Sequence, residues 1–221
     1  MKVPVPVLLV VLVLIMTACG TQTRPTTTTA AAAASTTGNP VYTAPEVVFM
    51  GDSITAWWNM PTYFPGKHYD DEGVPGNTTA QMLTRFSSDV IAYNPKVVVI
   101  LGGTNSLGYV SNEEVESELQ GMYTAAQQAG IKVVACTITP RRPTASDARG
   151  DLTPQIVAVN EWIRNYCANN GIVVADYYPA LAGPDGWLPE NLTVDFVHLT
   201  PEAYSIITPI AAQAIASAEQ Q

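Results

Sequence analysis

Short apolar runs rich in β-branched residues alternate along the chain with longer segments in which apolar residues recur every three or four positions. The first pattern is typical of buried strands and the second of amphipathic helices. The short runs predict strands at 46–50, 96–101, 131–138 and 172–176. The longer segments predict helices at 78–93, 112–129 and 153–170, and a last helix from Thr200-Pro201. This alternation predicts an α/β domain whose parallel sheet is covered by helices on both faces.

Polar residues mark the ends of several predicted helices. Thr78 and Gln81 have the spacing of a capping box, and Gly171 follows the helix that starts at Thr153-Pro154. The run at 96–101, Lys-Val-Val-Val-Ile-Leu, has the composition of a strand buried on both faces. In parallel sheets of this kind, ligands bind beyond the carboxyl ends of the strands, so the loops after the strands are where a site is expected.

The first residues are expected to be an export signal rather than part of the domain. An apolar run at 3–16 follows the first lysine, with the length of a signal-peptide core and too few residues to span a membrane. It ends in Met-Thr-Ala-Cys-Gly, which is similar to a bacterial lipobox except that Met stands where Leu is usual. We expect a signal peptide at 1–18 and acylation of Cys19. The alternatives are cleavage near Ala18 without a lipid and an uncleaved anchor, and all three export the chain.

Residues 19–45 are expected to be the lipidated terminus and a linker. Between Gly20 and Asn39 the chain has eight threonines and five consecutive alanines, with almost no charge. Such a stretch is typical of a flexible tether that holds a domain away from a membrane. The folded domain is then residues 46–221. We expect a membrane-anchored lipoprotein of the bacterial cell envelope, or a secreted or periplasmic protein if no lipid is attached.

Composition narrows the function of this domain by exclusion. A hydrophobic content of 47% is enough for a packed core. The formal net charge of −9 becomes −10 when Lys2 leaves with the signal peptide, which argues against a nucleic-acid partner. Two histidines and three cysteines are too few for a multi-metal site or a disulfide framework. We therefore expect no metal and no cofactor.

Residues with catalytic chemistry follow the ends of the predicted strands. Ser53 lies in Gly-Asp-Ser, where a strand-to-helix turn can project a hydroxyl group into a cleft. Gly76 lies in a loop whose backbone can approach a ligand closely, and the Asn105 amide can donate to an oxyanion. Asp195 can hold one ring nitrogen of His198 and leave the other free as a base. Each signal alone fits an ordinary cap or turn, but their order at successive strand ends indicates a hydrolase with a serine nucleophile.

On these residues the chain resembles the SGNH (GDSL-type) esterase/lipase family over the whole predicted domain. The resemblance implies that Ser53 is the nucleophile and that His198 and Asp195 complete the triad. It also implies an oxyanion hole made by the N–H groups of Ser53 and Gly76 with the Asn105 amide. The implied fold is the SGNH hydrolase fold, a flavodoxin-like three-layer sandwich with a five-stranded parallel sheet. The α/β-hydrolase alternative requires a G-x-S-x-G elbow, which the chain lacks.

The activity implied by the resemblance is hydrolysis of carboxylic esters through an acyl-enzyme intermediate. Short-chain acyl, acetyl and lysophospholipid-like esters are all open as substrates. An O-acyltransferase acting on a glycan would use the same catalytic residues, and a catalytically silent lipoprotein that binds a glycan or lipid is a further alternative. We expect a monomer whose partners are the ester substrate and, through the lipid, the membrane.

Two residues depart from the family pattern. Ser106 follows Asn105 where Asp is common, and Asp71 stands where many members have Asn before the glycine of the second loop. Both are expected to support loops rather than to react, so the departures bear on loop rigidity and rate more than on the type of reaction.

Other residues near the predicted strand ends have both a structural and a functional interpretation. Three arginines of the loop after the strand at 131–138 are expected to be solvated beside the acidic residues of that loop, with an anionic substrate as the alternative: Arg141, Arg142 and Arg149. Three aromatic residues after the nucleophile either pack or line a pocket: Trp57, Trp58 and Tyr63.

The remaining titratable groups are expected to be structural. His68 stands alone in the sequence and is interpreted as a surface or packing residue, and 70–72 (Asp-Asp-Glu) as a solvated turn rather than a cation site. Cys136 and Cys167 are expected to be buried free thiols, with a disulfide between them as the alternative that export permits.

Overall fold

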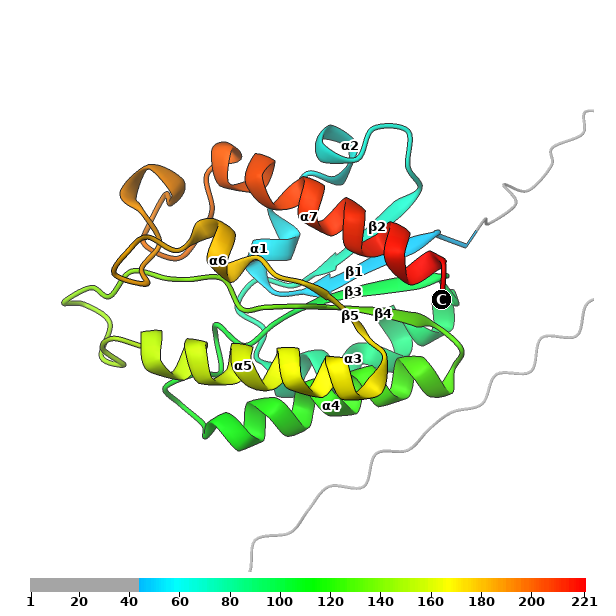
Figure 1. Ribbon diagram of the computed structural model, residues 1–221, viewed down its shortest axis with the longest axis horizontal. Helices are drawn as coiled ribbons and strands as arrows, with labels where there is room; N and C mark the ends of the chain where they lie inside the picture. The colour runs from blue at the N-terminus through cyan, green and yellow to red at the C-terminus, as the bar shows by residue number, and fades with distance from the viewer. Residues whose placement is uncertain (1–43) are drawn as a thin grey trace, which may run out of the picture. The chain divides into compact units, whose positions relative to one another are not determined.

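A five-stranded parallel sheet forms the middle layer of the protein, seen here in a computed structural model that describes residues 44–221 (Figure 1). The strand order is β2-β1-β3-β4-β5. The strands are β1 (Val47–Gly51), β2 (Tyr69–Gly73), β3 (Val97–Leu101), β4 (Lys132–Cys136) and β5 (Val173–Ala175). The predicted α/β fold with five parallel strands is confirmed. The predicted signal peptide, Cys19 and all but the end of the linker lie outside the described residues.

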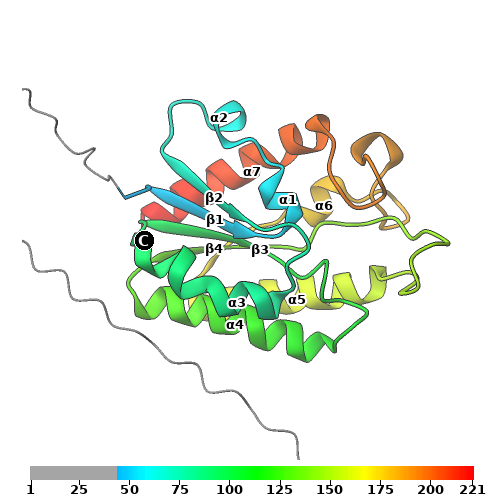
Figure 2. The ribbon, with the colours of Figure 1, turned by 180° about the vertical axis from the view of Figure 1, so that it is seen from behind.

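Helices cover both faces of the sheet (Figures 1 and 2). One face is covered by α1 (Ser53–Ala56), α2 (Met60–Tyr63), α6 (Tyr178–Leu181) and α7 (Pro201–Glu219). The other face is covered by α3 (Thr79–Asp89), α4 (Asn112–Gln128) and α5 (Thr153–Asn170). Two single-turn 3₁₀ helices complete the described elements, η1 (Ile91–Tyr93) and η2 (Glu190–Leu192). The arrangement is the three-layer sandwich expected of parallel strands joined by helical crossovers.

The alternation of side chains along each central strand produces two hydrophobic cores. In β3, Val97, Val99 and Leu101 pack toward α7, whereas Val98 and Ile100 pack toward α3, α4 and α5. All five residues of β3 are buried. Burial on both faces explains why this strand is an unbroken apolar run in the sequence.

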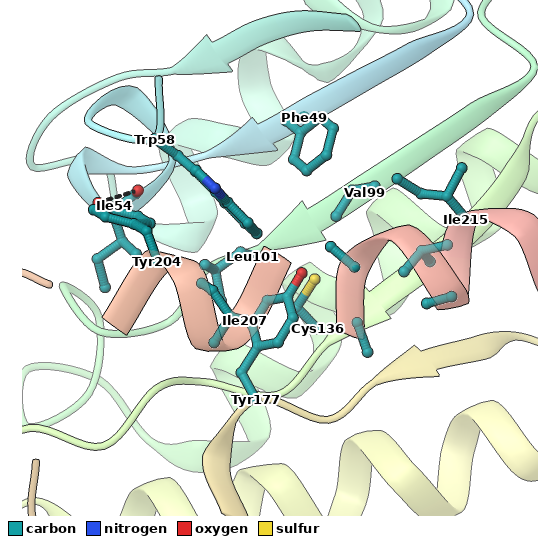
Figure 3. Close-up of a cluster of buried hydrophobic side chains, with 14 of the residues drawn as sticks. Phe49, Ile54, Trp58, Val99, Leu101, Cys136, Tyr177, Tyr204, Ile207 and Ile215 are labelled. Carbon is teal, nitrogen blue, oxygen red and sulfur yellow. Dashed lines mark hydrogen bonds between the residues drawn. The ribbon is translucent and has the colours of Figure 1, made fainter. Parts of the chain in front are cut away.

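Aromatic side chains fill the core beneath α7 (Figure 3). Trp58 is fully buried, with its ring centroid 5.5 Å from that of Phe49 and 5.7 Å from that of Tyr204. Its indole Nε1 donates to the Thr208 hydroxyl at 3.2 Å. Of the two tryptophans that follow Ser53, Trp58 is therefore a packing residue that joins β1 to α7.

The structure corrects several boundaries. The strands at 132–136 and 173–175 are shorter than predicted, and the helix predicted over 78–93 ends at Asp89 before η1. The acidic run at 70–72 is not a turn but the middle of β2, which pairs only with β1. An edge strand has one unpaired side facing water, so it accepts charged residues that a central strand excludes.

Asn160 on α5 fixes the end of β4. Its side chain is fully buried, and its carboxamide accepts the N–H of Ile138 at 2.7 Å and donates to the carbonyl of the same residue at 2.9 Å. Ile138 lies just beyond β4, where the chain leaves the sheet. The two bonds satisfy backbone groups that no neighbouring strand can reach, so they set the start of the loop that follows.

Replacing this carboxamide is expected to destabilise the fold. Asn160→Ala leaves both backbone groups of Ile138 buried and unpaired, which lowers the free energy of unfolding by about 2–4 kcal/mol in urea denaturation. Asn165→Ala on the exposed side of the same helix is the matched control and should change it by less than about 0.5 kcal/mol. Equal stability of the two variants would contradict the role given to Asn160.

Candidate active site

The turn after β1 presents Ser53 at the carboxyl end of the sheet. Asp52 caps α1, because its Oδ1 accepts the N–H of Ile54 at 2.9 Å, and Ser53 is the first residue of the helix. A Cβ atom at Gly51 would lie 2.0 Å from the Thr55 hydroxyl, so only glycine permits this tight turn. The structure thus places the Ser53 hydroxyl where the sequence predicts it.

A chain of hydrogen bonds joins Ser53, His198 and Asp195. The Oγ of Ser53 lies 2.8 Å from Nε2 of His198, and Nδ1 of His198 lies 2.6 Å from Oδ2 of Asp195. The other oxygen of Asp195 accepts the backbone N–H of His198 at 2.8 Å. Burial opposes ionisation of Asp195, but hydrogen bonds from the backbone and ring of His198 outweigh it and lower the pKa of the carboxyl group. An ionised Asp195 therefore holds the ring with Nε2 toward Ser53.

Helix α7 determines where His198 lies. The helix starts at Pro201, with Thr200 as its cap, so the histidine loop leads directly into it. The Tyr204 hydroxyl donates to the carbonyl of Ile54 at 2.7 Å, which ties the first turn of α7 to the residue after Ser53 (Figure 3). This bond is buried and connects the two segments that supply Ser53 and His198.

Asn105 links the loops that follow β1, β2 and β3. Its Nδ2 donates to Oδ2 of Asp52 at 3.3 Å and to the carbonyl of Asn77 at 3.1 Å. Gly76, beside Asn77, has φ +79°, a conformation that side-chain-bearing residues rarely adopt. Ser53, Gly76 and Asn105 therefore follow the carboxyl ends of β1, β2 and β3, and these contacts join Asn105 to the turn that carries Ser53 and to the Gly76 loop. Asp195 and His198 come from the loop that leads into α7.

Asp52 is a site residue that sequence analysis did not single out. It is 1% exposed, and desolvation by burial raises the pKa of its carboxyl group to about 6, although hydrogen bonding to Ile54 and the charge of His198 oppose this. A buried carboxylate beside Ser53 is unusual, since burial of charge is unfavourable unless the charge is compensated. The sequence offered one signal for Asp52, its position next to Ser53 in the Gly-Asp-Ser motif. Its contact with Asn105 could be seen only in the folded chain.

The two departures from the family pattern support neighbouring loops, as expected. Ser106 is buried, its hydroxyl accepts the N–H of Thr79 at 2.9 Å, and the Thr79 hydroxyl donates in turn to Glu118 of α4. Asp71 accepts the N–H of Gly73 at 2.8 Å at the end of β2. Glu118 thus provides a carboxylate near a position where related sequences commonly have Asp.

Trp57 contacts the site directly, whereas the neighbouring Trp58 does not. The Trp57 ring is 49% exposed, and its centroid lies 3.9 Å from that of His198 with an interplanar angle of 32°. The indole face therefore limits the movement of the imidazole. Tyr63, the third aromatic residue of this group, packs against the core of α7 and donates to the Pro201 carbonyl at 3.1 Å.

The expectation of a solvated arginine loop is wrong for two of the three arginines. Arg141 is 4% exposed and pairs with Asp147, which also binds Arg149. The half-buried Arg149 side chain also donates to the Thr104 carbonyl. Arg142 pairs with Glu190 at 3.1 Å, and its side chain is the most exposed of the three arginines. Sequence spacing cannot show that two guanidinium groups share one carboxylate.

The remaining titratable residues are structural. His68 is exposed, which agrees with its interpretation as a surface residue rather than a packing residue. Cys136 and Cys167 are buried free thiols, as predicted, and burial raises the pKa of each to about 12. Within residues 44–221 no three His, Cys, Asp or Glu side chains gather as a metal site would require, and no helix there is long and apolar enough to cross a membrane.

Comparison with known proteins decides the family. The profile of the GDSL-like lipase/acylhydrolase family matches residues 49–206, which include all five predicted site residues. The chain belongs to this family. It is similar to a crystal structure of a GDSL-like lipase from Bacteroides thetaiotaomicron, with 32% sequence identity and a TM-score of 0.74 over 78% of this chain and 88% of that one.

Curated relatives are more distant. A platelet-activating factor acetylhydrolase IB subunit alpha2 from Gallus gallus is 26% identical over 74% of this chain and 72% of its own length. An N-acylneuraminate cytidylyltransferase from Streptococcus agalactiae is 29% identical over 72% of this chain. The match covers only 36% of that protein, so this chain corresponds to about a third of its length.

The raised pKa of Asp52 predicts a pH-dependent stability effect. Because the pKa is about 6 in the fold and 3.8 in the unfolded chain, Asp52 favours folding at acidic pH, and this contribution is lost as the pH rises through 6. Asp52→Asn keeps the helix cap and removes the titration. Between pH 4 and 7.5 the stability of the variant relative to the native protein should rise by about 2 kcal/mol. Urea denaturation at the two pH values measures this, and a pH-independent difference would contradict it.

Proposed function

We propose that this protein is a serine esterase that hydrolyses carboxylic esters through an acyl-enzyme intermediate on Ser53. The observation that carries the proposal is the hydrogen-bond chain in which His198 contacts Ser53 at 2.8 Å and Asp195 at 2.6 Å. Membership of the GDSL-like lipase/acylhydrolase family supports the same reaction class. The name of the avian relative, an acetylhydrolase, favours short acyl groups as substrates.

In the proposed cycle, His198 moves the protons. Its Nε2 takes the proton of the Ser53 hydroxyl as the oxygen attacks the ester carbonyl, and then gives this proton to the leaving alcohol. Asp195 holds the tautomer with hydrogen on Nδ1 and stabilises the imidazolium. Water then attacks the acyl-enzyme; His198 takes a proton from this water and returns it to the Ser53 oxygen as the bond to the acyl group breaks and the carboxylic acid leaves. Trp57, stacked on the ring, keeps the imidazole in place while it is charged.

The proposed oxyanion hole consists of the backbone N–H groups of Ser53 and Gly76 with the side chain of Asn105. Both amide protons of Asn105 are engaged in the structure, one by the Asn77 carbonyl and one by the carboxylate of Asp52. The bond to Asp52 is the longer, at 3.3 Å, and an oxyanion would compete for that proton. Loss of one oxyanion donor typically raises the barrier by about 3–4 kcal/mol.

Removal of the nucleophile or the base tests the mechanism. Ser53→Ala and His198→Ala should each lower kcat for 4-nitrophenyl acetate by roughly 10⁴-fold, because neither variant can form the acyl-enzyme efficiently. Ser205→Ala, an exposed serine on α7, is the matched control and should retain full activity. A fluorophosphonate should label the native protein at Ser53 and leave Ser53→Ala unlabelled. Full activity in a folded Ser53→Ala protein would exclude the mechanism, and absence of hydrolysis by the native protein would favour a silent binding protein.

We also propose that the chain is a lipoprotein anchored through Cys19, a residue outside the described part of the chain. The proposal rests on the lipobox-like sequence and the Thr/Ala-rich linker. Two or more acyl chains anchor stably, since each buried CH₂ contributes about 0.8 kcal/mol. The native protein should therefore partition with membranes, whereas Cys19→Ala should remain unprocessed or become soluble. Mass spectrometry that finds an unmodified mature terminus would refute the anchor and leave the esterase proposal unaffected.

A further inference from the structure

A cavity of about 450 Å³ lies beside the catalytic carboxylate, with Asp195 in its wall. Its other walls come from Tyr109 in the loop between β3 and α4, from the loop between β4 and α5, and from residues 196 and 197, which precede His198. This volume falls in the range of small-molecule sites. A substrate whose ester lies at Ser53 would therefore have room for a further group in a cavity next to the triad.

Two exposed aromatic rings stand in the walls of this cavity. Tyr109 is 75% exposed and Phe196 is 46% exposed, although large apolar side chains are usually withdrawn from water. Phe196 has φ +77°, a strained conformation for a residue with a bulky side chain. Its carbonyl accepts the N–H of Arg142 at 2.8 Å, which holds this conformation against the β4–α5 loop. The Arg149 guanidinium lies over one face of the Tyr109 ring, 5.0 Å from its centroid, so the other face of Tyr109 and the Phe196 ring are left to pack against a ring-shaped ligand.

Arg141, which also lines the cavity, has hydrogen-bond donors without partners. Its Nη2 binds Asp147, but its Nε and Nη1 are buried and meet no acceptor among the described residues. Buried polar groups are nearly always paired, and an unpaired charged donor is more unfavourable than a neutral one. In contrast, the Arg149 guanidinium donates to Asp147 and to the carbonyls of Thr104 and Leu107.

The unpaired donors at the cavity, rather than an excess of charge, favour an anion, because the charged residues of its wall are two arginines and two aspartates. Asp147 is shared by Arg149 and Arg141, whose hydrogen bonds hold the pKa of its carboxyl group well below the usual range. Two guanidinium groups thus share one carboxylate, and Arg141 keeps donors without a partner. The other acid in the wall, Asp195, is engaged by the ring and backbone of His198. The spare donors of Arg141 form part of a planar fork, which suits a carboxylate.

We propose that this cavity binds a carboxylate on the ester substrate, so that the enzyme prefers ring-bearing esters with a negative charge, and that Arg141 is the residue that recognises it. The inference rests on the proposed esterase function. The Nε and Nη1 atoms are sealed from bulk water, so binding of the carboxylate requires a local shift of side chains in the cavity wall that uncovers these two atoms. Tyr109 and Phe196 then pack against the ring.

Matched pairs of esters test the preference. With the carboxylate on the alcohol part, the pair is 3-acetoxybenzoate and its methyl ester; with the carboxylate on the acyl part, it is mono-4-nitrophenyl succinate and its methyl ester. In at least one pair the charged member should have a kcat/KM about 10- to 100-fold above its neutral twin, the range of a hydrogen bond to a charged group. The pair that responds tells which part of the substrate enters the cavity.

Variants assign the preference to Arg141. Arg141→Gln should abolish the advantage of the charged ester, mainly through KM, and Arg141→Lys should keep only part of it because lysine lacks the fork. Arg142→Gln is the matched control, since it removes the same charge from the adjacent residue, which does not line the cavity, and should preserve the advantage. The kcat/KM of the neutral ester serves as the control for damage to the loop. If the role of Arg141 were purely structural, its substitution would lower kcat/KM equally for the charged and the neutral ester.

A measurement on the native protein covers the case in which Arg141→Gln does not fold. Benzoate should inhibit hydrolysis of 4-nitrophenyl acetate competitively at concentrations where benzamide, its neutral analogue, does not. Equal kcat/KM within both ester pairs, or an advantage that survives in Arg141→Gln, would overturn the inference. Neither result would affect the esterase proposal, which depends only on hydrolysis of the neutral esters by Ser53.

Discussion

The docking of α7 against the turn that carries Ser53 is the contact on which the site depends. Ser53 and His198 are 145 residues apart in the chain, yet their side chains are 2.8 Å apart. The histidine loop leads directly into α7, and the first turn of α7 is tied to that of α1 by the bond from Tyr204 to the Ile54 carbonyl. A shift of α7 by one helical turn, about 5.4 Å, would separate the two reacting groups. Packing of Trp58 between Phe49 and Tyr204 opposes such a shift.

Several unfavourable features of the domain lie around this contact. Asp52 is a buried carboxyl group beside Ser53, and Phe196 has a left-handed backbone conformation beside Asp195. Arg141 adds a guanidinium group that is only partly paired. Each feature alone destabilises the fold, and the two hydrophobic cores on either side of the sheet compensate for them. Strain and unpaired polar groups are typical of positions where ligand binding or catalysis, rather than stability, has determined the residue.

The loops at the carboxyl ends of the strands are held by side chains from their neighbours. Asn105 joins the nucleophile turn to the loop after β2, and Ser106 caps the start of α3 through the N–H of Thr79. The Thr79 hydroxyl then reaches Glu118 on α4. Because the carboxylate comes from a neighbouring helix, serine can occupy position 106 without leaving this network uncharged. The carboxylate of this network thus comes from a residue distant in the sequence.

The sequence by itself determined the fold class and pointed to residues that the folded chain brings together. The period of apolar residues specified which segments become strands or helices, and Ser53, Asn105 and Asp195 stood out because each lies beside a strand end or in a short motif. The acidic run of β2 was missed because an edge strand need not be apolar. The burial of Asp52, the sharing of Asp147 by two arginines and the stacking of Trp57 on His198 were decided only by the tertiary structure. Those properties depend on distances between segments far apart in the chain, and local periodicity contains no information about such distances.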